Sequence, residues 1–281
     1  MSGAAAGALG IIAGGGELPR AIAMSAQAAG RKVFVLRLGD LTGDWANGFP
    51  NEQVALGELG RAFKAFKAHA CTDITLAGKV QRPKFSEIKL DARAVLAAPR
   101  VVAAALKGDD ALLRAVVDMF EREGLRVVGA AEAAPDLIAK PGVMTRTKPT
   151  QEGLGDVELA LKVARAMGAF DVGQAAIVCA GLTLAVEAAE GTDATMARVA
   201  NLPEHIRGTP SKPRGVLVKA PKPIQDRKTD LPVVGVDTVR NAHAVSLAGI
   251  AVEAGGALIV DREAVIAEAD KLGVFVMGVP R

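Results

Sequence analysis

The sequence is poor in aromatic residues and in cysteine, and each shortage excludes a class of protein. Aromatic residues make up 3% of the chain, with one Trp and no Tyr. Proteins that hold single-stranded nucleic acid need stacking rings, so we expect no nucleic-acid partner. Cys71 and Cys179 stand alone in the two halves of the chain. They have neither disulfide nor zinc spacing, which indicates reduced, buried thiols of a cytoplasmic protein.

Long apolar runs and a strong net charge are also missing. No uninterrupted apolar run reaches the length of a membrane span, and the N-terminus lacks the cationic region of a signal peptide. The net charge of +3 is too small for a general polyanion binder. We therefore expect a cytoplasmic protein, with contact at a membrane surface left open.

The first half of the chain alternates strand and helix signals. We predict strands at 9–13, 33–38, 73–77 and 125–128, and helices at 18–29, 59–68, 92–105 and 111–123. Strands alternating with helices are typical of a parallel sheet with helices on its faces. The sequence predicts an N-terminal Rossmann-like domain over residues 1–133.

Prolines and glycines interrupt this pattern over 134–155, where we place the interdomain connection. Residues 156–281 are predicted to form a C-terminal α/β domain that carries the catalytic loop. Its expected helices are 157–167, 193–200, 238–254 and 262–272, and its expected strands are 175–179, 182–188, 257–260 and 274–277. The predicted fold class is α/β, with an N-terminal Rossmann-like parallel sheet, a C-terminal mixed α/β domain and a ligand cleft between them.

A basic, proline-rich loop lies between two strand-like runs of the second half. From Arg207 to Lys228, basic residues outnumber acids by seven to one, and Asp230 follows. Fixed cations beside carboxylates suit a phosphate ester held with a divalent metal. The alternative is a solvated loop that closes a hairpin. The candidate residues here are Lys219, Lys222, Gln225, Asp226, Lys228 and Asp230.

A glycine loop follows the first predicted strand. Gly14, Gly15 and Gly16, with Leu18 beyond them, would let backbone amides approach a phosphate at a helix N-terminus. The pattern departs from the dinucleotide motif because Pro19 replaces its last glycine. The alternative is a turn that only permits tight packing of strand and helix.

Polar residues also mark the ends of other predicted strands. Gly78 and Lys79 follow a strand at the kind of edge where ligands collect. Gly191 and Thr192 open a helix and are candidates for a phosphate contact, while Thr192 also suits an N-cap. Glu187 precedes them and adds a carboxylate that could help to hold a metal. Gln174 begins a strand, where a structural role is the alternative.

Four stretches occur together and in order: Ile11–Pro19, Lys107–Arg114, Val186–Asp193 and Lys219–Gly235. With this ordered set, the chain resembles the LpxI family of UDP-2,3-diacylglucosamine pyrophosphatases of lipid A biosynthesis. The resemblance runs from about residue 9 to the C-terminus.

The resemblance implies a reaction and a location. Family members cleave the pyrophosphate of this lipid-linked nucleotide sugar to 2,3-diacylglucosamine 1-phosphate (lipid X) and UMP. Water attacks the phosphorus nearer the sugar, with Mg²⁺ or another divalent metal such as Mn²⁺. The family is cytosolic or peripheral to the membrane, which here means the cytoplasmic face of the inner membrane. Whether the protein forms a homodimer is left open.

The resemblance also assigns residues. The essential aspartate of the family's Asp-Leu-Pro motif falls on Asp230, and Lys228 stands where the family usually has Arg. We expect Asp230, Asp226 and Lys219 to be catalytic, with Asp230 and Asp226 holding the metal. The alternatives are an NAD(P)-linked oxidoreductase built on the glycine loop and a non-catalytic protein that binds a nucleotide or a lipid.

Overall fold

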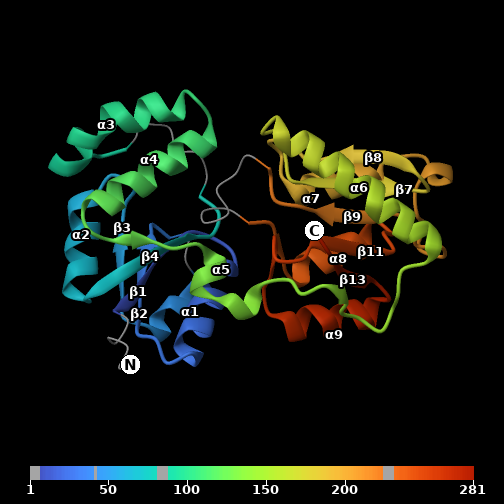
Figure 1. The fold of residues 1–281 in the computed structure, drawn as a ribbon, viewed down its shortest axis with the longest axis horizontal. Coiled ribbons are helices and arrows are strands. Elements are labelled where there is room, and N and C mark those ends of the chain that lie inside the picture. Colours follow the sequence, from blue (N-terminus) through green and yellow to red (C-terminus); the bar gives the residue numbers. More distant parts are fainter. Residues whose placement is uncertain (1–6, 41–42, 81–87, 224–230) are drawn as a thin grey trace. The chain divides into compact units, whose positions relative to one another are not determined.

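The computed structural model describes residues 7–40, 43–80, 88–223 and 231–281 (Figure 1). The chain forms two compact units, Met1–Asp136 and Leu137–Arg281, called unit 1 and unit 2 below. Each unit is built of β-strands and α-helices, which confirms the predicted α/β class with a parallel sheet in the first unit and a mixed sheet in the second. Within the described ranges, no helix is long and apolar enough to cross a membrane.

Unit 1 is built around a parallel five-stranded sheet with the strand order β3-β2-β1-β4-β5. Its strands are β1 (Ala8–Ala13), β2 (Val33–Leu38), β3 (Asn51–Val54), β4 (Cys71–Ala77) and β5 (Arg126–Val127). Its helices are α1 (Leu18–Ala28), α2 (Leu59–Ala68), α3 (Ala92–Ala105), α4 (Asp109–Arg122) and α5 (Ala130–Ala133), with a 3₁₀ turn at Asp44–Gly48.

Alternation of side chains along the strands decides which helices cover which face of this sheet. Ile12, Phe34, Leu36 and Ile74 point to one face, where they pack against α2 and α4. Helices α1 and α5 cover the other face. Both faces are therefore buried, as a parallel sheet requires.

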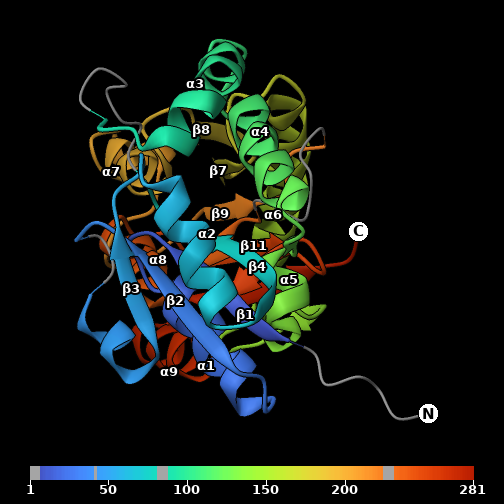
Figure 2. The ribbon, with the colours of Figure 1, turned by 90° about the vertical axis from the view of Figure 1, so that its left-hand side faces the viewer.

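Helix α3 belongs to an outer layer of unit 1, where it packs against α4 and α2 (Figure 2). The helix begins at the cap residue Asp91, whose carboxylate accepts a hydrogen bond from the amide of Ala94 at 2.9 Å. Its bounds match the prediction, because the apolar periodicity and the aspartate cap are both visible in the sequence.

Unit 2 contains a mixed six-stranded sheet with the order β6-β13-β11-β9-β7-β8, and a short parallel pair, β10-β12. The strands are β6 (Gly142–Val143), β7 (Ala175–Cys179), β8 (Leu182–Val186), β9 (Val216–Lys219), β10 (Val233–Val234), β11 (Gly249–Glu253), β12 (Leu258–Ile259) and β13 (Phe275–Val279). The helices are α6 (Gln151–Ala169), α7 (Thr192–Ala200), α8 (Val236–Ala244) and α9 (Arg262–Leu272), with 3₁₀ turns at Pro135–Leu137, which spans the boundary of the units, and Glu204–Ile206.

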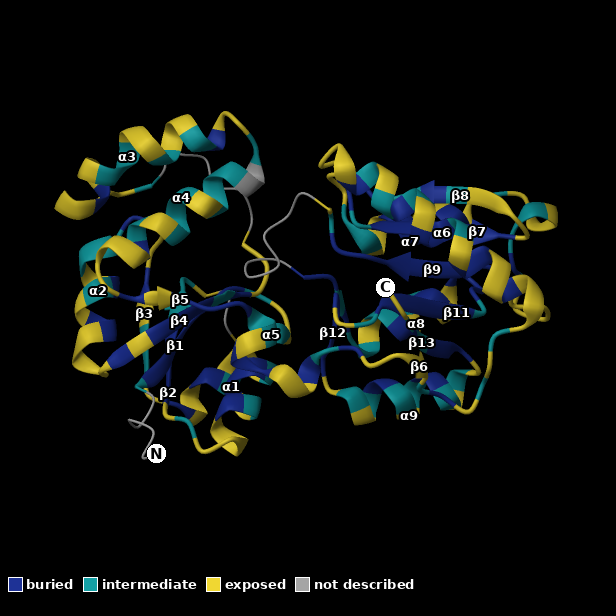
Figure 3. Ribbon diagram, in the orientation of Figure 1, coloured by how far each residue is buried: buried dark blue, intermediate teal, exposed yellow. Residues whose placement is uncertain are grey.

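Helix α6 covers one face of the large sheet, where Val157, Leu161 and Ala164 pack against Val216 and Val218. Helices α7, α8 and α9 pack on the opposite face around Leu217, Ile250 and Val252. In Figure 3 the strands of this sheet are mostly buried, while the helices are buried on one side and exposed on the other.

The predicted helix over 238–254 is wrong in its second half. Helix α8 ends at Ala244, and the backbone turns at Ser246, whose φ of 61° is not helical. The apolar run that follows forms β11, a strand buried at every position. A short apolar run fits a buried strand as well as a helix, so periodicity alone cannot separate the two.

The segment 134–155, predicted to be the interdomain connection, contains β6 and the start of α6. Strand β6 pairs with β13, and the Thr150 hydroxyl accepts a hydrogen bond from the Gly153 amide at the start of α6. Much of this segment therefore contributes regular structure to unit 2.

Candidate active site

The glycine loop of unit 1 lies at the point where the strand order reverses direction. Strands β2 and β3 lie on one side of β1 and β4 lies on the other, so the loops after β1 and β4 meet at the same edge of the sheet. Ligands of open α/β sheets bind at such points. The loop after β1 holds Gly14–Gly16, and the loop after β4 holds Gly78 and Lys79.

The backbones of these two loops are hydrogen-bonded to each other. The Gly15 amide donates to the Lys79 carbonyl at 2.9 Å, and the Lys79 amide donates to the Gly15 carbonyl at 2.8 Å. A Cβ atom on Gly14 would lie 2.7 Å from the Lys79 carbonyl oxygen. The predicted site residues of the two loops therefore lie side by side. Gly14 permits their close packing, as the alternative interpretation of the glycine loop expected.

Backbone amides of the next residues are better placed for an anion. Gly16 is exposed, and α1 begins two residues later with no side-chain hydrogen bond from its N-cap Glu17. Helix N-termini favour negative charge, because their first amides lack intrahelical partners. Leu18 is the first residue of α1 and is half-buried.

Arg37 is a cation at the same edge that the motif analysis did not single out as a candidate. Its Cα is in register with Ala13, immediately before the glycines. Its Nε is buried without a hydrogen-bond partner. The sequence did contain a signal for Arg37, because an arginine near the end of the second strand of a Rossmann-like unit can contact a nucleotide phosphate.

In unit 2, four strand ends carry polar side chains to one edge of the sheet. Gln174 precedes β7, Glu187 follows β8, Lys219 ends β9 and Glu253 ends β11. Because β7 is antiparallel to its neighbours, its start lies beside their ends. We call these four residues the polar edge of unit 2. Three of them were predicted site residues, and the strand order brings them together.

Glu187 joins two other predicted residues. One carboxylate oxygen accepts a hydrogen bond from the Thr192 hydroxyl at 2.8 Å, and the other accepts one from the Gln174 amide nitrogen of the backbone at 3.2 Å. The side chain of Glu187 is nearly buried. Gly191 precedes Thr192 with a φ of 80°, which permits the turn into α7. Glu187 therefore fixes the position of this turn relative to β7.

Gln174 has a side-chain atom in need of a partner. Its amide oxygen is buried and has no hydrogen-bond partner. Leaving such an acceptor unpaired costs about 1–3 kcal/mol. A ligand with an N–H or O–H donor would remove this cost.

Lys219 and Lys222 make contacts beside the two ends of the segment 224–230. The Lys219 ammonium, on a buried side chain, donates to the Val233 carbonyl at 2.9 Å. Lys222 forms an ion pair with Asp171 at 2.7 Å. The Lys219 contact holds the chain just after residue 230, and the Lys222 contact holds it just before residue 224. Gln225, Asp226, Lys228 and Asp230 lie outside the described residues.

Glu253 is a candidate site residue that the sequence analysis missed. Its side chain is 3% exposed and forms an ion pair with Arg165 of α6 at 2.8 Å. It lies next to β9, because Val252 is in register with Lys219. An acid at the end of an apolar run and before Gly255-Gly256 was a signal, but the predicted helix over 238–254 concealed it.

The pKa shifts of the cysteines and of Glu190 each have a local cause. Burial raises the pKa of the Cys71 thiol to about 11 and raises the pKa of Cys179 as well. Both cysteines are free and buried, which confirms the prediction of buried thiols without a disulfide. Glu190 pairs with Arg198 at 2.9 Å, and a hydrogen bond from its own backbone lowers its pKa. In the described part of the chain, no three His, Cys, Asp or Glu residues form a metal-binding group.

Two family models cover nearly the whole chain. The model of the LpxI N-terminal domain matches residues 8–137, and that of the LpxI C-terminal domain matches residues 140–277. The chain belongs to the LpxI family. This assignment confirms the resemblance found in the sequence.

One curated relative is the UDP-2,3-diacylglucosamine pyrophosphatase LpxI of Caulobacter vibrioides. It is 50% identical over 271 residues, which are 96% of this chain and 97% of the relative. Among solved structures, glycinamide-RNase-transformylase T from Mycobacterium tuberculosis aligns at 12% identity with a TM-score of 0.24, over 74% of this chain and 46% of that one.

Proposed function

We propose that this protein hydrolyses the pyrophosphate bond of UDP-2,3-diacylglucosamine to 2,3-diacylglucosamine 1-phosphate and UMP. The observation that carries the proposal is the 50% identity to the curated pyrophosphatase along 96% of the chain. Both halves of the enzyme are present, since the two family models together run from residue 8 to residue 277.

The described geometry supports a phosphate-handling role. The exposed Gly16 and the uncapped start of α1 offer backbone amides to an anion, and Arg37 lies at the same edge. The polar edge of unit 2 offers the unpaired amide oxygen of Gln174, which suits a donor such as the N–H of a uracil ring. Few aromatic residues leave polar groups and backbone to read the base.

Asp230 is the residue we propose at the centre of the reaction. It would orient the attacking water or hold a metal ion, and Lys219 would keep the chain after it in place through the Val233 carbonyl. A water oxygen adds to the phosphorus nearer the sugar, the bond from that phosphorus to the bridging oxygen breaks, and UMP leaves with the bridging oxygen.

Magnesium or manganese is part of the proposal, and the described carboxylates narrow the choice of ligands. Glu187 already accepts two hydrogen bonds, and Glu253 is paired with Arg165. The ligands we propose are Asp226 and Asp230, the acids that the sequence assigned to the metal, with substrate oxygens completing its shell. When bound, the ion would neutralise charge on the phosphate oxygens. Metal dependence and a cytoplasmic location stay predictions, and whether the protein forms a homodimer stays open.

The test is hydrolysis of detergent-dispersed UDP-2,3-diacylglucosamine by wild type and by Asp230→Ala, each with Mg²⁺ and with EDTA. We expect UMP and lipid X from wild type with Mg²⁺, and a loss on the order of 10³-fold in kcat for the variant. Asp237→Ala is the matched control, because this aspartate is 86% exposed at the start of α8 and should keep full activity. Absence of UMP from folded wild type with Mg²⁺, and with Mn²⁺ in its place, would refute the proposal.

A further inference from the structure

Phe170 is an exposed aromatic side chain in a chain that has few aromatic residues. It is 81% exposed and follows the last residue of α6. The other phenylalanines that the structure describes are buried or half-buried: Phe34, Phe49, Phe63, Phe66, Phe120 and Phe275. A single exposed apolar side chain is ordinary on a protein surface, so its surroundings decide whether it has a role.

Two ion pairs place the turn after α6 at the polar edge of unit 2. Arg165, in the last turns of α6, pairs with Glu253 of the polar edge at 2.8 Å. Asp171 pairs at 2.7 Å with Lys222, which follows the end of β9. Phe170 lies between Arg165 and Asp171 in the sequence. The exposed ring therefore belongs to the same end of the sheet as the candidate site.

Hydrogen bonds fix the backbone of this turn. The Asp171 amide donates to the Gly168 carbonyl at 3.1 Å, and the Val172 amide donates to the Met167 carbonyl at 3.2 Å. Asp171 has a φ of 58°, in the left-handed region where glycine is usual at the end of a helix. The aspartate at this position also supplies the ion pair described above. The exposed ring of Phe170 therefore starts from a fixed backbone.

This way of ending a helix does not itself require the ring. The residue after the left-handed one commonly packs back on the helix, and Val172, in that position, is 37% exposed. Phe170 has no such role in the turn. An aromatic ring left in water forgoes the free energy that its burial would contribute, and a ligand that covers it would recover that free energy.

The proposed substrate needs an apolar contact close to its phosphate. Its two acyl chains branch from the sugar carbons that are next to, and one removed from, the carbon that carries the phosphate. The site of the reacting phosphate and the site of the first part of an acyl chain are therefore neighbours. Lys222, which leads into the segment that contains Asp230, is paired with the turn that presents Phe170.

We propose that Phe170, with Val172 beside it, contacts one acyl chain of UDP-2,3-diacylglucosamine while the sugar phosphate lies at the polar edge. The inference rests on the proposed function and adds to it a residue that favours acylated substrate. It gives the exposed ring an occupant whose apolar part begins within a few bonds of the reacting phosphate.

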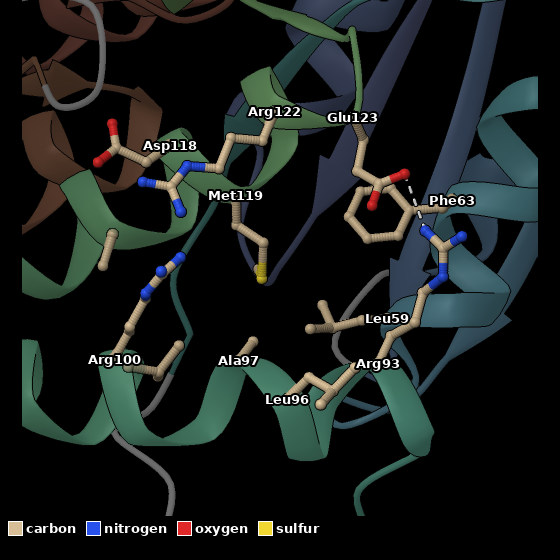
Figure 4. Close-up of a pocket in the computed structure, with 12 residues that line it drawn as sticks. Leu59, Phe63, Arg93, Leu96, Ala97, Arg100, Asp118, Met119, Arg122 and Glu123 are labelled. Carbon is tan, nitrogen blue, oxygen red and sulfur yellow. Dashed lines mark ion pairs between the residues drawn. The ribbon is translucent and has the colours of Figure 1, made fainter.

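A groove of about 530 Å³ in unit 1, between α2, α3 and α4, is the alternative site for an acyl chain (Figure 4). Its middle is apolar, but charged side chains line both of its ends: Arg93 and Glu123 at one, and Arg100, Asp118 and Arg122 at the other. None of the candidate site residues described above lines this groove. The turn after α6 fits the substrate better, because it is tied to the candidate site.

The test measures KM for two substrates that differ only in acyl-chain length, in mixed micelles of fixed composition. Phe170→Ala should raise KM for the long-chain substrate about five- to tenfold, the factor expected from losing the burial of about 50 Å² of apolar surface. KM for a short-chain substrate should stay nearly unchanged. kcat should change little, because the acyl chain makes the same contact in the ground state and the transition state.

Leu182→Ala is the matched control. Leu182 is 48% exposed at the start of β8, where it is in register with Cys179 at the end of β7, opposite the polar edge. Its replacement should leave both KM values unchanged. Phe170→Leu, which keeps an apolar side chain, should retain most of the dependence on chain length.

Several outcomes would overturn the contact. A KM for the long-chain substrate that is unchanged in folded Phe170→Ala would exclude it. An equal rise for short and long chains would mean that the ring enters the detergent or, if inhibition by UMP also weakens, that it contacts the base. A chain-length effect of Leu96→Ala in its place would move the acyl site to the groove of unit 1. Failure of the proposed function would instead appear as no hydrolysis of either substrate by wild type.

Discussion

The candidate ligand-binding edges of the two sheets are held together by different kinds of interaction. In unit 1 the loops after β1 and β4 are held by backbone hydrogen bonds between Gly15 and Lys79, and glycines allow their close approach. In unit 2 the polar edge is held by side chains, with Glu187 bonded to Thr192 and Glu253 paired with Arg165. The backbone amides of unit 1 can bind an anion without a charged side chain. At the polar edge of unit 2, each charged side chain is held in its own position by a separate bond.

The comparison extends to where each unit buries charge. Unit 1 has a buried carboxylate, Asp73, but it lies at the start of β4, on the edge opposite the glycine loop. It is bonded to Arg31 and Arg126. In unit 2 the buried carboxylate of Asp156 accepts hydrogen bonds from the Ala180 and Gly181 amides in the turn between β7 and β8, so it too serves structure. Two further buried carboxylates of unit 2, Glu187 and Glu253, lie at strand ends beside Lys219. Both units thus use buried charge for structure, and unit 2 also places it at the candidate site.

The largest effect is expected where backbone packing is broken in unit 1. Gly78 has a φ of 92°, and a Cβ there would lie 2.7 Å from the Gly15 carbonyl oxygen. Gly78→Ala should therefore cost about 3 kcal/mol in the free energy of unfolding, from backbone strain and overlap together. Urea titration followed by circular dichroism measures this cost.

Gly16→Ala is the matched control for that substitution. Gly16 has almost the same φ, 93°, but a Cβ there meets nothing within 4 Å. It should cost about 1 kcal/mol, from backbone strain alone. Equal costs for the two variants would show that close packing of the loops does not hold this edge.

The edge of unit 1 can be predicted from the sequence to a greater extent than the edge of unit 2. The bounds of β2, α2, α3 and α9 follow from apolar periodicity and caps, and the glycine loop is visible as a local motif. The side-chain bonds of unit 2 join residues distant in sequence, so they depend on a strand order that local patterns do not specify. Glu253 was missed for this reason, because its role appears only when β11 lies beside β9.

A second prediction concerns the buried charge of unit 1. Hydrogen bonds from Arg126, at 2.9 and 2.8 Å, and the bond from Arg31 lower the pKa of Asp73. A carboxyl whose pKa is lower in the folded state stabilises the protein above its unfolded pKa of about 3.9. That stabilisation is lost as the pH falls through the lower, folded value. Asp73→Asn should therefore cost about 2 kcal/mol at pH 7.

The pH series checks the sign of this effect. The difference in unfolding free energy between wild type and Asp73→Asn should stay constant from pH 7 to about pH 5 and shrink below about pH 3.9. Arg126→Gln should reduce the same acid-dependent part. A difference that is independent of pH would mean that Asp73 acts through packing and not through its charge.

The smallest effect is expected for a single side-chain bond at the polar edge of unit 2. A double-mutant cycle with Glu187→Gln, Thr192→Val and the double variant should give a coupling free energy of about 1 kcal/mol, because the hydroxyl donates to a nearly buried carboxylate. The pair Glu190 and Thr195, at 3.2 Å with Glu190 more exposed, is the control and should couple less.

Activity decides whether this bond serves the site as well as the fold. If Glu187 positions the turn at Gly191 and Thr192 for the substrate, Thr192→Val should raise KM, and Glu187→Gln should add little to that in the double variant, since both remove the same contact. If the effects of the two substitutions on KM were additive, Glu187 and Thr192 would act on the substrate independently. The side-chain edge of unit 2 would then act through each group alone.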